Sequence, residues 1–444
     1  MTAGTQMING FDPASLDTLP AVERDMVSRR AKLLGEAYKL FYDRPIQFAR
    51  GEGVWLYDAD GKPYLDVYNN VPQVGHCHPK VIEAVTRQIS TLNTHTRYLH
   101  DGILRYAEDL LATFDTGINR VMFTCSGSEA VDLALRVARY ETGGTGLIIT
   151  ENAYHGLTTA VAAISPSLGP NVPLGKEVFT VPAPDSYRAR VGEDIGDTFA
   201  ANVAAVIAHM KRRDIRPAAL VLDGVLSTDG VLTDPPGFLA KAVDVVHAAG
   251  GLYIADEVQG GFGRAGLGMW SFSRHGVTPD LVVMGKPMGN GLPIAAMAAR
   301  AEVLEKFGRD IRYFNTFGGN TVSIAAAQAV LNVIRDEGLI ENARVIGDYM
   351  ADGIRDLSRR FPAIGDVRNA GLFIGADFVT DPDSKAPDGA KALRVVNALR
   401  RKQVLISASG KTGNVLKIRP PLPFNRENAD LFLERLGEVL AEDQ

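Results

Sequence analysis

The chain has 444 residues, of which 46% are hydrophobic and 22% charged, and its length predicts two or three domains in a well-packed globule. The net charge of −5 argues against nucleic acid or an anionic membrane as a partner, and two cysteines exclude a disulfide framework. Because neither a signal sequence nor an apolar run of membrane-spanning length is visible, we expect a cytoplasmic protein with no membrane association.

The N-terminal part predicts a small hairpin and then a helix. Residues 53–58 and 63–67 alternate in hydrophobicity around an Asp60-Gly61 turn, which is typical of a β-hairpin. Pro79 is well placed as the first residue of a helix. The apolar positions expected on one face of that helix are Ile82, Val85, Ile89 and Leu92.

From residue 121 onwards the chain repeats the order strand, tight turn and helix. This alternation predicts an α/β fold with a mainly parallel central sheet covered by helices. We place this large domain at residues 76–325. The expected strands are 121–124, 147–150, 219–222, 252–255 and 281–284, with helices beginning at Glu129 and Pro236.

The C-terminal part predicts a second, smaller α/β unit. A long helical stretch follows the large domain, and residues 373–375, 404–406 and 415–418 are expected as short strands before a final amphipathic helix. We expect this unit, residues 326–444, to join the N-terminal hairpin, within residues 1–75, in one small domain.

Two functional side chains follow short apolar strands. Asp256 comes directly after 252–255, and Lys286 lies two residues beyond 281–284. Ligands gather at the carboxyl ends of buried parallel strands, so both side chains are expected to face one crevice. An acid and a lysine there suit pyridoxal phosphate, because the lysine forms an imine with the cofactor aldehyde and the carboxylate keeps the pyridine nitrogen protonated. Either residue alone is more often an ordinary turn or surface residue.

The first helix of the large domain offers a site for the cofactor phosphate. Ser126, Gly127 and Ser128 stand at its start, where unpaired N–H groups and the helix dipole attract an anion. A serine before a helix is also the usual N-cap, so this segment gains weight only together with Asp256 and Lys286.

Three more residues are candidates for contacts with the pyridine ring. Tyr154 follows the strand at 147–150 and can stack on the ring. Val258 lies two residues beyond Asp256 and is expected to pack on the opposite ring face, while Gln259 can donate a hydrogen bond to the ring oxygen.

Two other motifs contain residues typical of binding sites, but their sequence context does not predict such a site. His76, Cys77 and His78 contain metal-binding side chains, but no second Cys/His cluster completes a tetrahedral site, so no metal is predicted. Residues 261–266 match the glycine pattern of dinucleotide-binding proteins, but they do not open a helix directly after a strand.

The segments 126–130, 154–156, 256–259 and 315–320, together with Lys286, resemble the class III aminotransferases of pyridoxal phosphate fold type I. The resemblance covers about residues 53–421. It implies the aspartate aminotransferase-like fold, pyridoxal 5'-phosphate as cofactor, and a homodimer or dimer of dimers with shared active sites.

The same resemblance implies roles for individual residues. Lys286 would be the catalytic Schiff-base lysine, Asp256 the partner of the pyridinium nitrogen and Tyr154 the stacking residue. Thr316 would reach the cofactor phosphate bound by the partner subunit. Asp223 stands where many members carry a glutamate, an acid that often neutralises a substrate-binding arginine in the aminotransferases.

Within the family, the segments 69–79, 92–100, 284–291 and 414–421 look like the ethanolamine-phosphate phospho-lyase branch and its relatives that act on 5-phosphohydroxylysine. We therefore expect β-elimination that converts phosphoethanolamine to acetaldehyde, ammonia and phosphate. The alternatives are an ω-aminotransferase, such as an alanine-glyoxylate enzyme, and a catalytically silent protein of the same fold. Retention of Lys286 and Asp256 counts against the silent protein.

A phosphorylated amine needs cations around its leaving group, since hydrogen bonds from charged donors strengthen as negative charge builds up. The candidates are Arg419, Lys411, Arg97 and Arg44, with Asn70 lining the same pocket. Arg419 is favoured because its family position binds substrate anions, whereas each of the others is more often a solvated surface charge.

Overall fold

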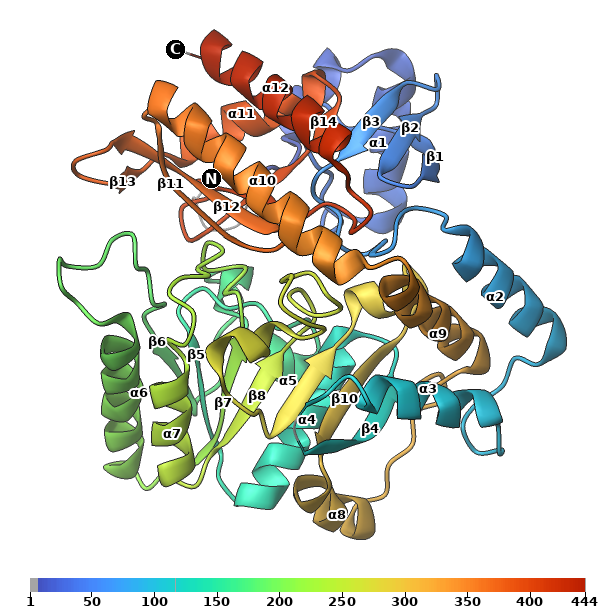
Figure 1. The fold of residues 1–444 in the computed structure, drawn as a ribbon, viewed down its shortest axis with the longest axis vertical. Coiled ribbons are helices and arrows are strands. Elements are labelled where there is room, and N and C mark those ends of the chain that lie inside the picture. Colours follow the sequence, from blue (N-terminus) through green and yellow to red (C-terminus); the bar gives the residue numbers. More distant parts are fainter. Residues whose placement is uncertain (1–6, 116, 444) are drawn as a thin grey trace.

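A seven-stranded sheet forms the centre of the larger domain in the computed structural model, which describes residues 7–115 and 117–443 (Figure 1). The strands are parallel except for β10, which runs antiparallel to both of its neighbours. All five strands expected from the sequence belong to this sheet, whereas β6 and β10 were not expected. The order across the sheet is β4 (Ile118–Thr124), β10 (Ala295–Arg300), β9 (Leu281–Met284), β8 (Leu252–Asp256), β7 (Pro217–Asp223), β5 (Gly146–Thr150) and β6 (Val178–Val181).

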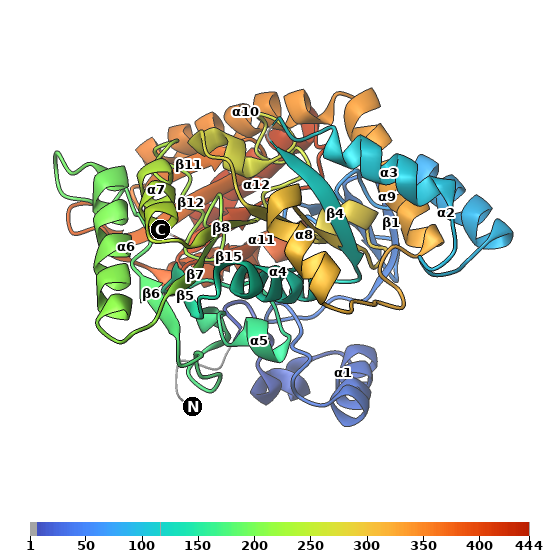
Figure 2. The same cartoon turned by 90° about the horizontal axis from the view of Figure 1, so that it is seen from below.

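Helices cover both faces of the sheet, with α4 on one face and α7 on the other (Figure 2). Side chains alternate between the two cores along each strand: Leu147 and Ile149 pack with α4, whereas Ile148 packs in the opposite core. These continuous apolar runs reflect strands that are buried on both faces. The helices of this domain are α2 (Pro79–Thr91), α3 (Asp101–Leu111), α4 (Gly127–Thr142), α5 (Thr159–Ala162), α6 (Ile195–Lys211), α7 (Ala240–Ala248) and α8 (Ala301–Asp310).

Two predicted helix starts differ from the structure. The helix expected from Glu129 begins two residues earlier, after the N-cap Ser126. The helix expected from Pro236 begins at Ala240 instead. Residues 236–239 form turns, and Gly237 has a φ of 89°, which is incompatible with a right-handed helix.

Helix α2 starts at Pro79 as predicted, but its predicted apolar face is not buried within the chain. Ile82 and Ile89 are 52% and 56% exposed, while Val81 and Ala84 are the buried residues of this helix. A sequence pattern indicates an apolar face but not what covers it. Here that face remains on the surface of the single chain.

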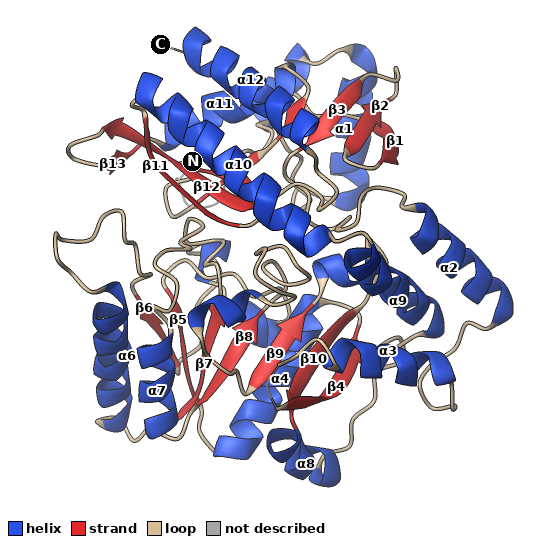
Figure 3. Cartoon of the chain, viewed as in Figure 1, coloured by secondary structure: helices blue, strands red, loops and turns tan. Residues whose placement is uncertain are grey.

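The N-terminal hairpin lies beside the C-terminal helices and strands (Figure 3), and β14 pairs with β3. A second sheet in this domain contains β16, the strand that carries Arg419 just beyond its end. The strands are β1 (Phe48–Glu52), β2 (Trp55–Asp58), β3 (Pro63–Asp66), β11 (Ile364–Ala370), β12 (Phe373–Asp381), β13 (Ala386–Pro387), β14 (Val404–Leu405), β15 (Ser407–Ser409) and β16 (Val415–Ile418).

The long helical stretch expected after the large domain is two helices separated by Gly338, whose φ of 63° ends the first of them. The domain boundary proposed between residues 325 and 326 lies inside the first of these helices, α9 (Thr321–Asp336). Across the described ranges, no helix combines the length and the apolar character needed to cross a bilayer. The remaining helices are α1 (Ala21–Leu34), α9 (Thr321–Asp336), α10 (Leu339–Arg360), α11 (Gly389–Arg401) and α12 (Arg426–Glu442).

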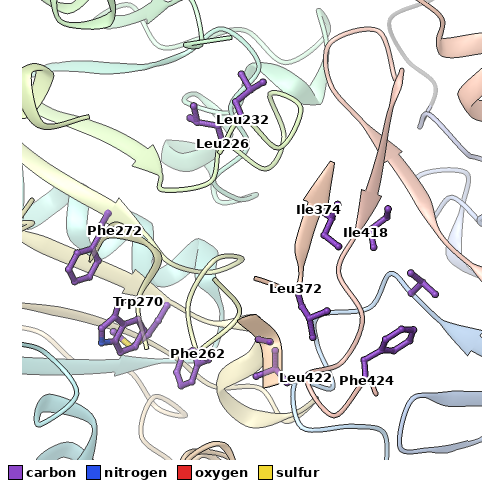
Figure 4. Packing of buried hydrophobic residues seen from close by; sticks show 14 of the residues in the cluster. Leu226, Leu232, Phe262, Trp270, Phe272, Leu372, Ile374, Ile418, Leu422 and Phe424 are labelled. Carbon is purple, nitrogen blue, oxygen red and sulfur yellow. The ribbon is translucent and has the colours of Figure 1, made fainter. Parts of the chain in front are cut away.

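The loop 261–266 connects the two domains. Its Arg264 is fully buried, and its guanidinium donates to the carbonyl oxygens of Leu372 and Pro420, at 3.0 and 2.7 Å, and to Oε1 of Gln73 at 2.7 Å. Apolar residues of both domains meet around this loop (Figure 4). The glycine pattern that imitates a dinucleotide site thus belongs to the domain interface. The residues labelled in the figure include Phe262 and Trp270 from the large domain and Leu372, Leu422 and Phe424 from the small one.

Arg264→Ala should destabilise the protein, because it leaves buried oxygens of Leu372, Pro420 and Gln73 without a donor. We expect the free energy of unfolding to fall by about 3 kcal/mol, seen as a lower thermal midpoint. Arg309→Ala, which removes an exposed guanidinium paired with a neighbouring aspartate, serves as the control and should change the midpoint little. Equal midpoints for the Arg264→Ala protein and the wild type would contradict a connecting role for this residue.

Candidate active site

The carboxyl ends of three neighbouring parallel strands meet at one edge of the large sheet. Asp256 ends β8, Asp223 ends β7 directly beside it, and Lys286 follows β9 after one intervening residue. Asp256 and Lys286 therefore lie at the same edge of the sheet. The negative charges of Asp256 and Asp223 favour the charged form of Lys286 and so oppose the lowering of its pKa.

The Lys286 side chain is exposed in the single chain, but the surrounding protein is close enough to change the pKa of its ammonium group. Burial lowers the pKa of its ammonium group, and repulsion from Arg419 lowers it further. A lysine with a lowered pKa supplies more of the neutral amine, which is the form that attacks a carbonyl or accepts a proton.

Asp256 is buried and held by a histidine whose role was not predicted. His155 Nδ1 lies 2.7 Å from Oδ2 of Asp256, and the backbone N–H of Val258 donates to Oδ1 at 3.1 Å. The carboxylate orients the imidazole so that Nδ1 donates to it. Tyr154 is half-buried nearby, and burial followed by the charge of Asp256 raises the pKa of its hydroxyl.

The start of α4 forms a narrow cradle beside these groups. Ser126 is the N-cap, and a Cβ at Gly127 would lie 3.1 Å from the Val258 side chain. A Cβ at Gly285 would lie 3.2 Å from the backbone nitrogen of Gly127, so the turn before Lys286 also approaches this helix end. The close approach brings the predicted phosphate site, the ring-packing residue and the lysine together, and an anion is favoured at such a helix end.

Arg419 enters the crevice from the small domain. It is 6% exposed, and Nη1 donates to Oδ1 of Asn70 at 2.8 Å and to Oε1 of Gln259. Its guanidinium lies over the Tyr68 ring, 4.5 Å from the centroid. Within residues 7–115 and 117–443, no carboxylate forms an ion pair with it. A buried cation held by neutral partners is suited to an anionic ligand.

Gln259 and Asp223 both have hydrogen-bond partners within the chain. Gln259 Nε2 donates to Ser227 Oγ at 2.7 Å, so its amide is engaged by Ser227 and Arg419. Asp223 accepts from the backbone N–H groups of Val225 and Ser227, both at 3.0 Å, and not from Arg419. Burial, together with the charge of Asp256, raises the pKa of Asp223.

The other predicted binding residues lie on the surface of the single chain. Arg97 is exposed and stacks on Phe314 at 3.7 Å, and Lys411 pairs with Glu151 at 3.4 Å. Thr316 is exposed in the loop between α8 and α9, and Arg44 is also exposed. The structure therefore brings Asn70 to Arg419 but does not bring these four residues to it.

The histidines considered as metal ligands have other partners. His76 Nε2 lies 2.8 Å from Asp66, and His78 Nε2 lies 3.5 Å from Glu337. In the part of the chain that the structure describes, no group of three His, Cys, Asp or Glu residues is arranged to hold a metal ion.

A model of the family described as Aminotransferase class-III matches residues 41–440. The chain belongs to this family. It has the fold type I architecture of its members, which depend on pyridoxal phosphate.

The relatives that the chain resembles are named for two different reactions. An "Alanine--glyoxylate aminotransferase 2-like" protein of Drosophila melanogaster is 39% identical, with 94% of this chain and 87% of the relative covered. An "Ethanolamine-phosphate phospho-lyase homolog 1" of Caenorhabditis elegans is 37% identical, with 94% and 93% covered. The family is thus shared, but the named reactions differ.

The solved structures similar to this chain are likewise named as a phospholyase or as aminotransferases. A phospholyase from Arthrobacter in complex with phosphoethanolamine matches with a TM-score of 0.91 and 44% identity, covering 94% of this chain and 99% of that one. A Bacillus anthracis aminotransferase matches with a TM-score of 0.86 and 26% identity, covering 96% and 100%.

The residues present fit pyridoxal phosphate. The helix-end cradle at 126–128 offers donors for its phosphate, and Asp256, buried beside His155, offers a carboxylate for a protonated ring nitrogen. The sequence analysis did not predict a role for His155, although this residue lies in the segment 154–156 that resembles the family. The signal that could have identified it was its position after a strand, next to Tyr154.

Asp229 is a further, half-buried acid beside this site. It accepts from Thr150 Oγ1 at 2.8 Å and from the backbone N–H of Asn152 at 3.2 Å. Burial is the main cause that raises its pKa from 3.8 to about 6. Because protonation is favoured in the folded state, its stabilising contribution is complete below pH 3.8 and is lost as the pH rises through about 6.

Asp229→Asn should therefore stabilise the protein in a pH-dependent way, since asparagine cannot ionise. Relative to the wild type, we expect a gain that is small near about pH 4.5 and approaches about 3 kcal/mol above about pH 7. Thermal unfolding at several pH values measures this difference. The exposed Asp244→Asn variant should show no such trend. A gain that does not vary with pH would contradict the raised pKa of Asp229.

Proposed function

We propose that the protein is a pyridoxal phosphate-dependent phospho-lyase that eliminates phosphate from a small phosphorylated amine. Phosphoethanolamine is the proposed substrate, with acetaldehyde, ammonia and phosphate as products, and 5-phosphohydroxylysine is the alternative substrate. The main support is Arg419, a buried cation that pairs with no carboxylate of residues 7–115 and 117–443 and whose charge lowers the pKa of Lys286. The similarity to a phospholyase in complex with phosphoethanolamine adds to it.

In this proposal each residue of the crevice has a defined role. Lys286 holds the cofactor covalently, and Asp256, hydrogen-bonded to His155, keeps the ring nitrogen of the cofactor protonated. The segment 126–128 binds the cofactor phosphate. Tyr154 and Val258 pack against the ring, and Gln259 positions Arg419.

The chain's own groups then carry the elimination. Once the substrate amine has displaced Lys286 from the cofactor, the freed Lys286 amine removes the proton from the carbon that bears the substrate nitrogen, and its lowered pKa keeps it available as a base. Pyridoxal phosphate, when bound, supplies an electron sink for the pair left on that carbon. As the neighbouring C–O bond breaks, that pair forms a C=C bond and phosphate leaves with the electrons of the C–O bond. Arg419 stabilises its growing charge. Water converts the released unsaturated amine to acetaldehyde and ammonia.

The second candidate function is aminotransfer, favoured by the similarity to proteins named alanine-glyoxylate aminotransferases. It uses the same Lys286 and Asp256. In an aminotransferase Lys286 returns the proton to the cofactor side, so the amino group stays on the enzyme until a keto acid removes it. The two functions therefore differ in the requirement for a keto acid.

Incubation of the holoenzyme with phosphoethanolamine and no keto acid should release phosphate and acetaldehyde in equal amounts over many turnovers. Free phosphate and aldehyde are measured over time. Lys286→Ala should abolish release, because the base and the covalent attachment are both lost. Turnover that occurs only after a keto acid is added would favour the aminotransferase, and no turnover under either condition would exclude both reactions.

We also propose that the protein is a homodimer, alone or as a dimer of dimers, in which active sites are completed across the interface. An apolar surface formed by Tyr98, Leu99, Phe314 and Phe317 is 67%, 101%, 43% and 68% exposed at these residues. Apolar surface of this kind is suited to association with a second copy. Thr316 lies within this surface, where it would reach the partner's cofactor phosphate.

Leu99→Glu should weaken the dimer, because it places a charge in the centre of this apolar surface. We expect a shift toward monomer in light scattering coupled to size exclusion, with reduced retention of the cofactor. Val191→Glu, a change at a 108% exposed residue in the loop before α6, should leave both properties unchanged. A Leu99→Glu protein that remains fully dimeric would argue against this interface.

A further inference from the structure

We propose that Lys417 is a second cation of the substrate-phosphate site and that it holds the dianionic phosphate together with Arg419. This inference rests on the proposed phospho-lyase function and deepens it. A single arginine recognises many anions, including carboxylates. A buried ammonium beside it would select for a ligand with two negative charges.

The alternation of side chains along β16 places Lys417 on the same face of the strand as Arg419. Leu416 and Ile418 point into the apolar core of the small domain. The opposite face is directed at the large domain, since a Cβ added at Gly230 would lie 3.6 Å from Val415 Cγ2. Lys417 therefore lies between the small domain and the loop that follows β7.

Lys417 is a largely buried lysine between the two domains. It is 7% exposed, and within the described ranges no hydrogen bond or ion pair joins its Nζ to an acceptor. Nζ lies 5.8 Å from the centroid of the Phe373 ring. A charge that is largely removed from water is unfavourable without a partner, so a lysine at this position is suited to an anionic ligand.

Charged groups of both domains face this ammonium. Burial is the main cause that lowers its pKa well below the ordinary value, followed by repulsion from Arg419 on the same strand. Lys286 lowers it further, whereas Asp223 and Asp229 oppose the shift. Lys417 thus lies within electrostatic range of the Lys286 ammonium.

The donor groups match the chemistry of phosphate. Asn70 and Gln259 already occupy Nη1 of Arg419, while Nε is buried without a partner, so this arginine offers only part of its donor set. The three donors of Lys417 would supply further hydrogen bonds and the second positive charge. A carboxylate has one charge and two oxygens, so it would leave the pair of cations incompletely satisfied.

The test compares Lys417→Met and Lys417→Arg with the wild-type holoenzyme, using inorganic phosphate as the probe in titration calorimetry. We expect Lys417→Met to weaken phosphate binding by about 10- to 100-fold and Lys417→Arg to restore most of the loss. The Michaelis constant for phosphoethanolamine should rise in parallel. Lys62→Met removes an exposed charge from the same domain and should leave phosphate affinity unchanged.

Unchanged phosphate affinity in a folded, cofactor-loaded Lys417→Met protein would overturn the assignment of Lys417. Should that variant fail to fold, failure of Lys417→Arg to bind phosphate more tightly than it binds acetate would overturn it instead. The phospho-lyase proposal fails separately, when the wild-type holoenzyme releases no phosphate from phosphoethanolamine. In that outcome calorimetry with inorganic phosphate still decides whether Lys417 belongs to an anion site.

Discussion

The burial of opposite charges in one crevice is the constraint on which the site depends. Asp223 and Asp256 stand at the ends of adjacent parallel strands, where burial and then the charge of Asp256 raise the pKa of Asp223. Both carboxylates favour the charged form of Lys286 from the next strand, whereas burial and Arg419 from the small domain oppose it. None of these charges is stable in such a position alone, so the site exists only while both domains hold their parts in place.

Contacts at the domain interface hold the small domain in place, so that Arg419 stays beside the charged residues of the large domain. Arg188, in the large domain, forms a two-pronged contact with Asp377 on β12, at 2.8 and 2.9 Å, and Arg368 joins the same carboxylate at 3.2 Å. Asp377 pairs in register with Val415 at the start of β16. The strand that presents Arg419 and Lys417 is therefore fixed to the large domain by contacts outside the crevice, which preserves the distance between the cations and Lys286.

Much of this arrangement could be predicted from the sequence because it follows from strand ends. A short apolar run ending in Asp256, and another followed by Lys286, place both residues at one edge of a parallel sheet without any knowledge of distances. The exposed face of α2 could not be predicted, since Ile82 and Ile89 show the same spacing whether the chain itself or another copy covers them. Lys417 was missed for a related reason: a single lysine in a strand resembles a solvent-facing charge until its neighbours are known.

The residues proposed to hold the cofactor do not by themselves choose between elimination and aminotransfer. Lys286 and Asp256 would serve both reactions, and the choice depends on whether the neighbouring carbon carries a group that can leave with its bonding electrons. The protein can favour elimination only by stabilising that leaving group, so selectivity must come from the side of the crevice that the small domain forms. Asp223 is tied to its own loop and leaves Arg419 unneutralised. An arginine that no acid of the described residues neutralises would favour a doubly charged leaving group over the keto acid that an aminotransferase requires.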